Sequence, residues 1–155
     1  MARPQGEKTI VSNRRAFHEY HVEERFEAGV VLAGSEVKSV RDGHVSLGEA
    51  YATVRDGEVW LVGATIEPYK QAGHGNHERT RDRKLLLHRR EITKIRQGTD
   101  EKGYTLVPLR LYFKDGRVKI EVGLGRGKNV ADKRQAMASR DAKREIDRAL
   151  KESAH

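Results

Sequence analysis

The chain has 155 residues, with 31 Lys and Arg against 23 Asp and Glu, which gives a formal net charge of +8. This balance favours a polyanionic partner, with nucleic acid first and an anionic membrane surface second. The absence of cysteine excludes a disulfide framework, a thiol nucleophile and a Cys-based zinc site. No apolar run reaches the length of a membrane span and the N-terminus lacks a secretory signal, so we expect a cytoplasmic protein of one domain.

The first third of the chain predicts an arm, a strand and a short helix. Residues 1–16 are polar and basic, and we expect a flexible N-terminal arm. Residues 17–32 alternate loosely between apolar and polar types, which predicts a strand bent at Gly29. The segment that follows predicts a helix of at most two turns, in which Ser35 is the N-cap and Gly43 ends the last turn.

The middle third predicts a hairpin, a loop and a second helix. Asp56-Gly57 between alternating apolar runs is a strong hairpin signal. Residues 67–81 contain few apolar groups and predict a loop, and "RKLLLH" that follows is a short strand or the start of a helix. Residues 88–98 place apolar side chains on one face and predict a helix that ends at Gly98.

A second hairpin is predicted from "YTLVPLRLYF", the turn Asp115-Gly116 and "RVKIEVGL". In its first strand, we expect four apolar side chains to face the same way: Leu106, Leu109, Leu111 and Phe113. Val107-Pro108 shifts the phase of this alternation, and Pro108 indicates an edge position or a bulge. About six short strands and two short helices up to Leu124 predict a small antiparallel barrel or sandwich.

The C-terminal tail begins with "GRGKNVADKR", residues 125–134. If residues 132–150 are helical, alanines make up most of the apolar face, which buries too little area to offset the ordering entropy. We therefore expect a tail that is largely disordered alone and folds on an RNA surface. The alternative is a helix docked on the chain's own β domain.

Catalytic and metal-binding patterns are weak. The histidine pairs supply too few ligands for zinc and indicate surface or loop residues: His18 with His21, and His74 with His77. "GLGRGK" fails as a phosphate loop because Val122 and Asn129 occupy two of its required positions. The glutamates at 23–36 lie among basic residues and indicate surface salt bridges rather than an acid–base pair. We predict a protein without enzymatic activity, cofactor or metal.

Five basic clusters distinguish this chain from one with a single solvated face. They lie at 13–15, at Lys38 and Arg41, at 79–84, at 88–90 and at 126–134. Several phosphate contacts together give strong binding that weakens with salt. Small β-barrels commonly bind single-stranded or irregular RNA.

Several longer motifs occur in order along the chain: "NRRAFHEY", "FEAGVVLAGSEVKSVRDGHVSL", "RDRKLLLHRREI", "TLVPLRLYF" and "GLGRGKNVADKR". Together they closely resemble the SsrA-binding protein (SmpB) family, the partners of transfer-messenger RNA in bacterial trans-translation. The resemblance covers nearly the whole chain. It implies an OB-like closed antiparallel barrel of six strands with three helices over residues 17–124, followed by a basic tail over residues 125–155.

The resemblance also implies a function and partners. The family binds the tRNA-like domain of transfer-messenger RNA, enhances its alanylation and enters a stalled ribosome with elongation factor Tu. Elongation factor Tu and alanyl-tRNA synthetase would thus act on this chain indirectly, through the RNA. The tail would lie in the empty message channel near the small-subunit decoding centre and become helical there.

The resemblance assigns functional residues to two groups. The RNA-binding group comprises Asn13, Arg14, Glu27, Glu36, Lys38, Arg41, Lys84 and Leu87. The decoding-centre group comprises Gly127, Lys128, Asp132, Lys133 and Arg134. The carboxylates cannot meet phosphates, so they would accept hydrogen bonds from bases or 2′-hydroxyls, or orient nearby cations. Leu87 would pack under a base, or in the core.

The chain departs from some family members at two tail positions. Ala131 stands where some carry an aromatic residue or histidine before "DKR", and Ala142 stands where some carry tryptophan. Stacking on a ribosomal base is therefore not expected from residue 131. The alternative function is a ribosomal RNA-binding or assembly protein that uses the same β domain and arms, without preference for a tRNA-like fold.

Overall fold

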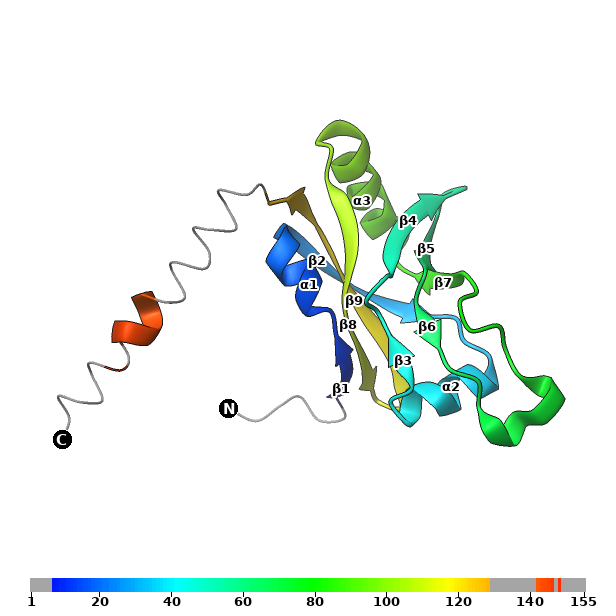
Figure 1. The fold of residues 1–155 in the computed structure, drawn as a ribbon. Helices are drawn as coiled ribbons and strands as arrows, with labels where there is room; N and C mark the ends of the chain where they lie inside the picture. The colour runs from blue at the N-terminus through cyan, green and yellow to red at the C-terminus, as the bar shows by residue number, and fades with distance from the viewer. Residues whose placement is uncertain (1–6, 129–141, 147, 149–155) are drawn as a thin grey trace.

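In the computed structural model, shown in Figure 1, the described residues are 7–128, 142–146 and 148. The elements are β1 (Glu7–Ser12), α1 (Arg14–Glu19), β2 (Tyr20–Val30), α2 (Gly34–Arg41), β3 (Val45–Ser46), β4 (Tyr51–Arg55), β5 (Glu58–Val62), β6 (Thr65–Ile66), the 3-10 turn η1 (Lys70–Gly75), β7 (Arg83–Leu86), α3 (Arg89–Glu101), β8 (Thr105–Lys114) and β9 (Arg117–Gly127). The fold is mainly β, as the sequence predicts. No helix in these described ranges is long and apolar enough to span a membrane.

Seven strands form one antiparallel sheet, in the order β1-β8-β9-β2-β7-β5-β4, and β3 pairs separately with β6. The expectation of a closed barrel was wrong, because the edge strands β1 and β4 do not pair with each other. The six-strand count is not confirmed either. The physical reason lies in β8, whose two edges are taken by β9 and, from Arg110 to Lys114, by β1. β4 approaches β8 without a ladder between them.

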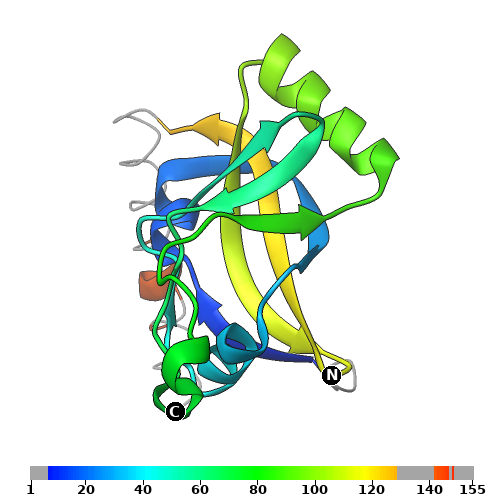
Figure 2. The same ribbon diagram turned by 90° about the vertical axis from the view of Figure 1, so that its right-hand side faces the viewer.

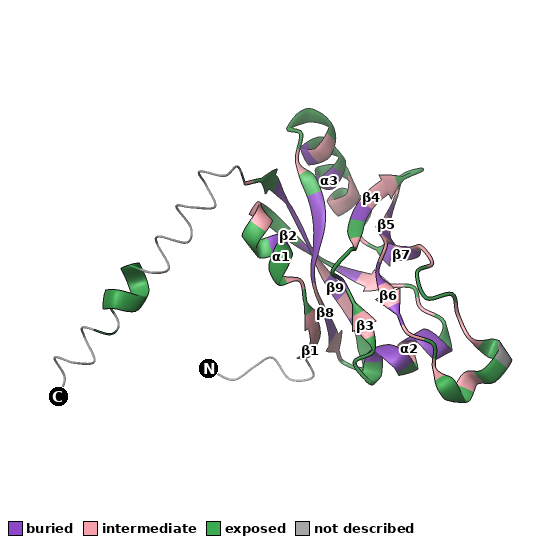
Figure 3. Cartoon of the chain, in the orientation of Figure 1, coloured by how far each residue is buried: buried purple, intermediate pink, exposed green. Residues whose placement is uncertain are grey.

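The core lies inside the curved sheet, with α3 at one end and α2 at the other (Figures 1 and 2). Buried side chains from both hairpins, from β7 and from the two helices form one continuous cluster. Val40 of α2 and Ile95 of α3 are fully buried in it. α3 packs against the sheet through Ile95, whereas the buried face of α2 combines Val40 with polar side chains and with the carboxylate of Glu36. Both helices also carry exposed residues on their outer sides (Figure 3).

Within the expected flexible arm over residues 1–16, the described residues 7–16 form a strand and the start of a helix instead. β1 pairs with β8, and Asn13 then begins α1 by accepting a hydrogen bond from the Ala16 amide on its side chain. Phe17 consequently belongs to a helix rather than to the predicted strand. In β2 the register shifts between Val22 and Glu24, rather than at Gly29.

Both Asp-Gly hairpins are confirmed. Asp56 and Asp115 have φ of 53° and 52°, and the glycines after them also have positive φ. Two successive residues with positive φ are typical of the tight turn whose twist matches antiparallel strands.

The helix that ends before Gly43 is confirmed, with a φ of 80° at this glycine. Its predicted cap is not confirmed, because Ala33 is the N-cap and Ser35 is the second helical residue. α3 continues beyond the predicted end at Gly98 to Glu101. A Cβ at Gly98 would lie 2.6 Å from Leu124 Cδ2, so this glycine permits close packing of α3 on β9.

In β8 the register shifts between Pro108 and Arg110, so the bulge predicted at Pro108 is confirmed. The predicted edge position also holds at this residue, because β1 pairs with β8 only from Arg110 onward and leaves β9 as the ladder partner of Pro108. The bulge also changes which way the side chains face. Leu106 and Leu111 lie in the main core, whereas Leu109 packs with Ala16 of α1 in a second cluster. The expectation that Leu109 shares a face with its neighbours was therefore wrong, because the extra residue inverts the alternation.

Candidate RNA-binding surface

The exposed face of α2 presents two cations that aromatic rings hold in place. Lys38 Nζ lies 5.3 Å from the centre of the Tyr69 ring, and the Arg41 guanidinium lies 5.8 Å from that of Phe113. Both side chains belong to exposed residues. Neither forms an ion pair within the part of the chain that the structure describes. A ring orients a cation without neutralising it, so both charges remain available to a phosphate.

A buried ion network holds α2 against β7. Glu36 and Arg83 have no exposed surface, and Arg83 Nε donates to Glu36 Oε2 at 2.6 Å. Arg81 reaches the same carboxylate, donating from Nε to both oxygens at 3.1 Å. The Ala33 amide also donates to Glu36 Oε1, at 2.8 Å. All acceptor positions of Glu36 thus face protein donors.

The pKa of Glu36 reflects this network. Burial alone would raise the pKa of this carboxyl group, but the hydrogen bonds from Arg81, Ala33 and Arg83 outweigh burial and hold it below its ordinary value. Burial lowers the pKa of Arg83. Because Glu36 has no accessible surface, a direct RNA contact from it does not fit this structure. The geometry matches the other role considered for it, which is to orient cations, here Arg81 beside α2.

Arg83 is the most important residue that the sequence analysis missed. It was placed among the surface cations of 79–84, yet it is fully buried and also donates to the Ala64 carbonyl at 2.9 Å. One signal could have found it. In a strand, alternate residues face the same side, and Leu85 belongs to the core, so Arg83 must face inward with it.

Glu27 and Leu87 lie around a groove of about 310 Å³ on the outer face of the β2–β7–β9 region. Glu27 accepts hydrogen bonds from the Tyr112 hydroxyl and from Lys114 Nζ, the latter at 3.2 Å. The hydrogen bond from Tyr112 is the main cause that lowers the pKa of Glu27, so it is an anion at neutral pH. Lys119 lines the same groove, beside the half-buried Leu87.

The side chains of the remaining RNA-binding candidates differ in the ion pairs and hydrogen bonds that they form within the protein. Arg14 is exposed and forms no ion pair or side-chain hydrogen bond among residues 7–128. Lys84 Nζ lies 3.7 Å from Glu58 Oε1, in an exposed pair. Asn13 Nδ2 donates to the Pro108 carbonyl at 3.0 Å, while its Oδ1 caps α1. The Asn13 side chain keeps one amide hydrogen and one lone pair for a partner.

Of the decoding-centre candidates, the structure describes Gly127 and Lys128, at the end of β9. Gly127 pairs with Tyr20 in the ladder, and the Lys128 amide donates to the Glu19 carbonyl at 2.7 Å. The tail candidates Asp132, Lys133 and Arg134 lie outside the described residues, as does Ala131. Ala142 lies in a described helical segment, 142–146.

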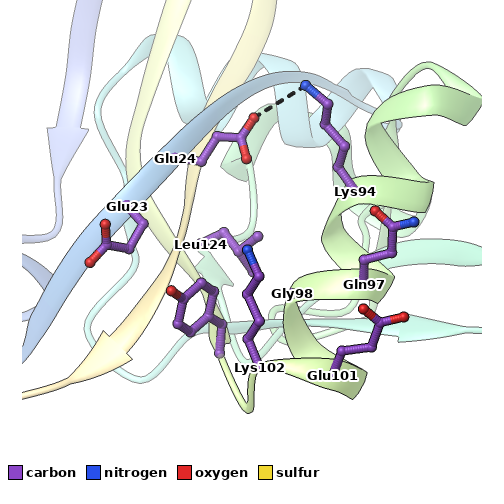
Figure 4. A pocket seen from close by; sticks show the side chains of 9 residues that line it. Glu23, Glu24, Lys94, Gln97, Gly98, Glu101, Lys102 and Leu124 are labelled. Carbon is purple, nitrogen blue, oxygen red and sulfur yellow. Dashed lines mark ion pairs between the residues drawn. The ribbon is translucent and has the colours of Figure 1, made fainter.

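A second groove, of about 390 Å³, lies between β2 and α3 (Figure 4). Its walls carry three carboxylates, from Glu23, Glu24 and Glu101, against two lysines. One lysine is already paired, because Lys94 Nζ lies 3.5 Å from Glu24 Oε1. This acidic lining repels phosphate, so we assign the phosphate-binding surface to the exposed cations at the α2 end instead.

These features define a small, mainly β protein with unpaired cations arranged for a polyanion. Comparison with known proteins specifies the class further. The profile of the SmpB protein family matches residues 10–152. The chain is 55% identical to the SsrA-binding protein of Roseiflexus castenholzii, over 99% of both chains. It is 55% identical to that of Acidothermus cellulolyticus, over 97% of this chain and 94% of the relative.

A solved structure supports the same conclusion. A chain from "tmRNA-SmpB: a journey to the center of the bacterial ribosome" is 41% identical, with a TM-score of 0.64, and the match covers 82% of this chain and 93% of that one. The chain belongs to the SmpB family of SsrA-binding proteins.

Proposed function

We propose that this protein binds the tRNA-like domain of transfer-messenger RNA and delivers that RNA to stalled ribosomes for trans-translation. One observation carries the proposal, which is the family relationship over nearly the full length of the chain. The structure adds a physical basis. The exposed cations of α2 have no carboxylate partner among the described residues, although many other basic side chains of the domain do.

The RNA-binding residues act in three ways in this proposal. Arg14, Lys38 and Arg41 contact phosphates, since their charges are exposed and unpaired. Lys84 joins them by exchanging its weak pair with Glu58 for a phosphate oxygen. None of these contacts reads sequence, so they set affinity and register on the RNA.

Shape recognition comes from the groove at Glu27. The Glu27 carboxylate is held ionised and accepts a hydrogen bond from a base amino group or a 2′-hydroxyl, while Leu87 packs under the base. Glu36 contributes through the cations that it fixes, without touching RNA. The protein therefore acts by binding and needs no catalytic group.

The tail, residues 125–155, serves the ribosome in this proposal. Gly127 and Lys128 begin the segment, and Asp132, Lys133 and Arg134 contact the decoding centre while the rest occupies the empty message channel. Elongation factor Tu and alanyl-tRNA synthetase meet the protein only through the shared RNA. These partners place the protein in the cytoplasm.

The test compares the affinity of the full chain for the tRNA-like domain with its affinity for a structured RNA of equal size, at two salt concentrations. We expect tighter binding to the tRNA-like domain at both salt concentrations. Counterion release contributes to the binding of either RNA, whereas shape recognition contributes only to the binding of the tRNA-like domain. Equal affinities with equal salt slopes would instead support the alternative, a general ribosomal RNA-binding or assembly protein.

A further inference from the structure

The C-terminal tail leaves the domain from a tightly held point next to α1 (Figure 1). Gly127 is still paired with Tyr20, and the Lys128 backbone amide donates to the Glu19 carbonyl at 2.7 Å. Lys128 Nζ donates to the Phe17 carbonyl at 3.3 Å. One residue thus binds two carbonyl groups at the end of the same helix.

These two carbonyls belong to the set that a helix leaves unpaired at its C-terminus. α1 ends at Glu19, and its cap satisfies only the Ala16 carbonyl, through the Tyr20 amide. Lys128 supplies donors for Phe17 and Glu19, and its ammonium group lies at the partially negative end of the helix. The start of the tail therefore satisfies two of the carbonyls that α1 leaves unpaired.

α1 is in turn fixed to the sheet at its other end. The Asn13 backbone amide donates to the Leu109 carbonyl at 2.7 Å, and Asn13 Nδ2 donates to the Pro108 carbonyl at 3.0 Å. Ala16 is 4% exposed and packs against Val107 and Leu109. These contacts lie at the bulge of β8, where the carbonyls of two successive residues face α1.

We propose that α1 is a clamp that fixes where the tail leaves the sheet, with Asn13 and Lys128 as its positioning residues. Asn13 holds the beginning of α1 on β8, and Lys128 holds its end on β9. The inference rests on the proposed function, because a tail that must reach the decoding centre while the domain holds RNA needs a defined point of departure. Asn13 then acts on the tail through α1, in addition to any contact of its own with RNA.

Amide hydrogen exchange in the full chain tests the clamp without RNA or ribosomes. Asn13→Ala removes the helix cap and the bond to Pro108, and we expect the protection of the Lys128 amide to fall about tenfold. Lys128→Met keeps the backbone bond and loses the ammonium donor, and we expect a loss of about fivefold. Arg14→Ala, one residue from Asn13 and exposed, is the matched control and should leave this protection unchanged. Unchanged protection in both test variants would overturn the clamp.

Two functional measurements on Asn13→Ala separate positioning from direct contact. The clamp predicts that tagging of a stalled nascent chain falls at least tenfold more than affinity for the tRNA-like domain does, whatever RNA contact Asn13 itself makes. A tenfold loss of that affinity with unchanged Lys128 protection would overturn the clamp and make Asn13 a direct RNA contact. Failure of the proposed function has a different signature, because the wild-type chain would show no preference for the tRNA-like domain whatever the exchange result.

Discussion

Replacing Glu36 with glutamine tests whether the buried ion network holds α2 in place. The substitution keeps the shape of the side chain but removes its charge, and leaves the fully buried Arg83 and the neighbouring Arg81 without an anion. Breaking a buried pair by removing one partner costs about 3–5 kcal/mol. For a protein of this size, that lowers the melting temperature by roughly 10 °C. Urea and thermal denaturation followed by circular dichroism measure both quantities.

The same variant has a defined pH dependence. The folded-state pKa of Glu36 is lowered, so its stabilisation is complete above its unfolded pKa of about 4.3 and is lost as pH falls through the folded value. The difference in unfolding free energy between wild type and Glu36→Gln should therefore be constant from pH 6 to 8 and shrink below about pH 4. If this difference in unfolding free energy is below about 1 kcal/mol above pH 6, the buried network does not hold α2 in place, because an ordinary exposed ion pair contributes as much.

Glu58→Gln is the matched control for this prediction. It removes the same charge from an exposed pair, in which Lys84 Nζ lies 3.7 Å away, and should cost less than about 1 kcal/mol. Adding Arg83→Met to Glu36→Gln should restore part of the lost stability, because the second change removes the buried unpaired charge. No recovery in the double variant would contradict the assignment of Arg83 as the main partner.

Three further predictions concern the tail and the surface. Truncation after Lys128 preserves all of β9, so the affinity for the tRNA-like domain should stay within about threefold of the wild-type value while tagging is abolished. Loss of both would contradict the proposal that the β domain binds the RNA and the tail serves the ribosome. Gly125→Ala should lower the unfolding free energy by about 1–3 kcal/mol, because a Cβ there would lie 1.9 Å from a backbone oxygen of β2, whereas Gly127→Ala meets nothing within 4 Å and should leave stability unchanged. Lys38→Ala and Arg41→Ala should each reduce the salt slope of RNA binding by about 1, and an unchanged slope would exclude a phosphate contact.

The sequence predicts well those features that depend on neighbouring residues. Asp56-Gly57 and Asp115-Gly116 define their turns because adjacent residues with positive φ suffice for a tight hairpin. Gly43 ends α2 for a similarly local reason. Pro108 indicates its bulge because proline cannot donate to a ladder.

Features that depend on distant residues were missed. Asn13 and Pro108 are 95 positions apart, and nothing local in residues 1–16 shows that β1 pairs with β8. The wrong prediction of a closed barrel follows from this pairing, because β1 occupies an edge of β8. Nothing local shows that Gly125, placed in the tail by the sequence analysis, lies in the β2–β9 ladder opposite Val22, where the close approach of two backbones excludes a side chain.

In the candidate site, too, some features could be predicted from the sequence and others depend on distant residues. A resemblance of motifs identified Lys38 and Arg41 as RNA-binding residues, and both are exposed and unpaired within the described ranges. It identified Glu36 as well, but the position of this carboxylate could not be inferred from its exposed neighbours in α2. Only the partners brought by β7 and the segment before it show that Glu36 is buried and paired with cations inside the protein.

Tagging of nascent chains on ribosomes stalled at the end of a message without a stop codon tests the central claim most directly. In a reconstituted translation system, we expect the degradation tag to appear only when this protein and transfer-messenger RNA are both present. Equal tagging without the protein, or no tagging although the RNA is bound, would contradict a role as the adaptor between that RNA and the stalled ribosome.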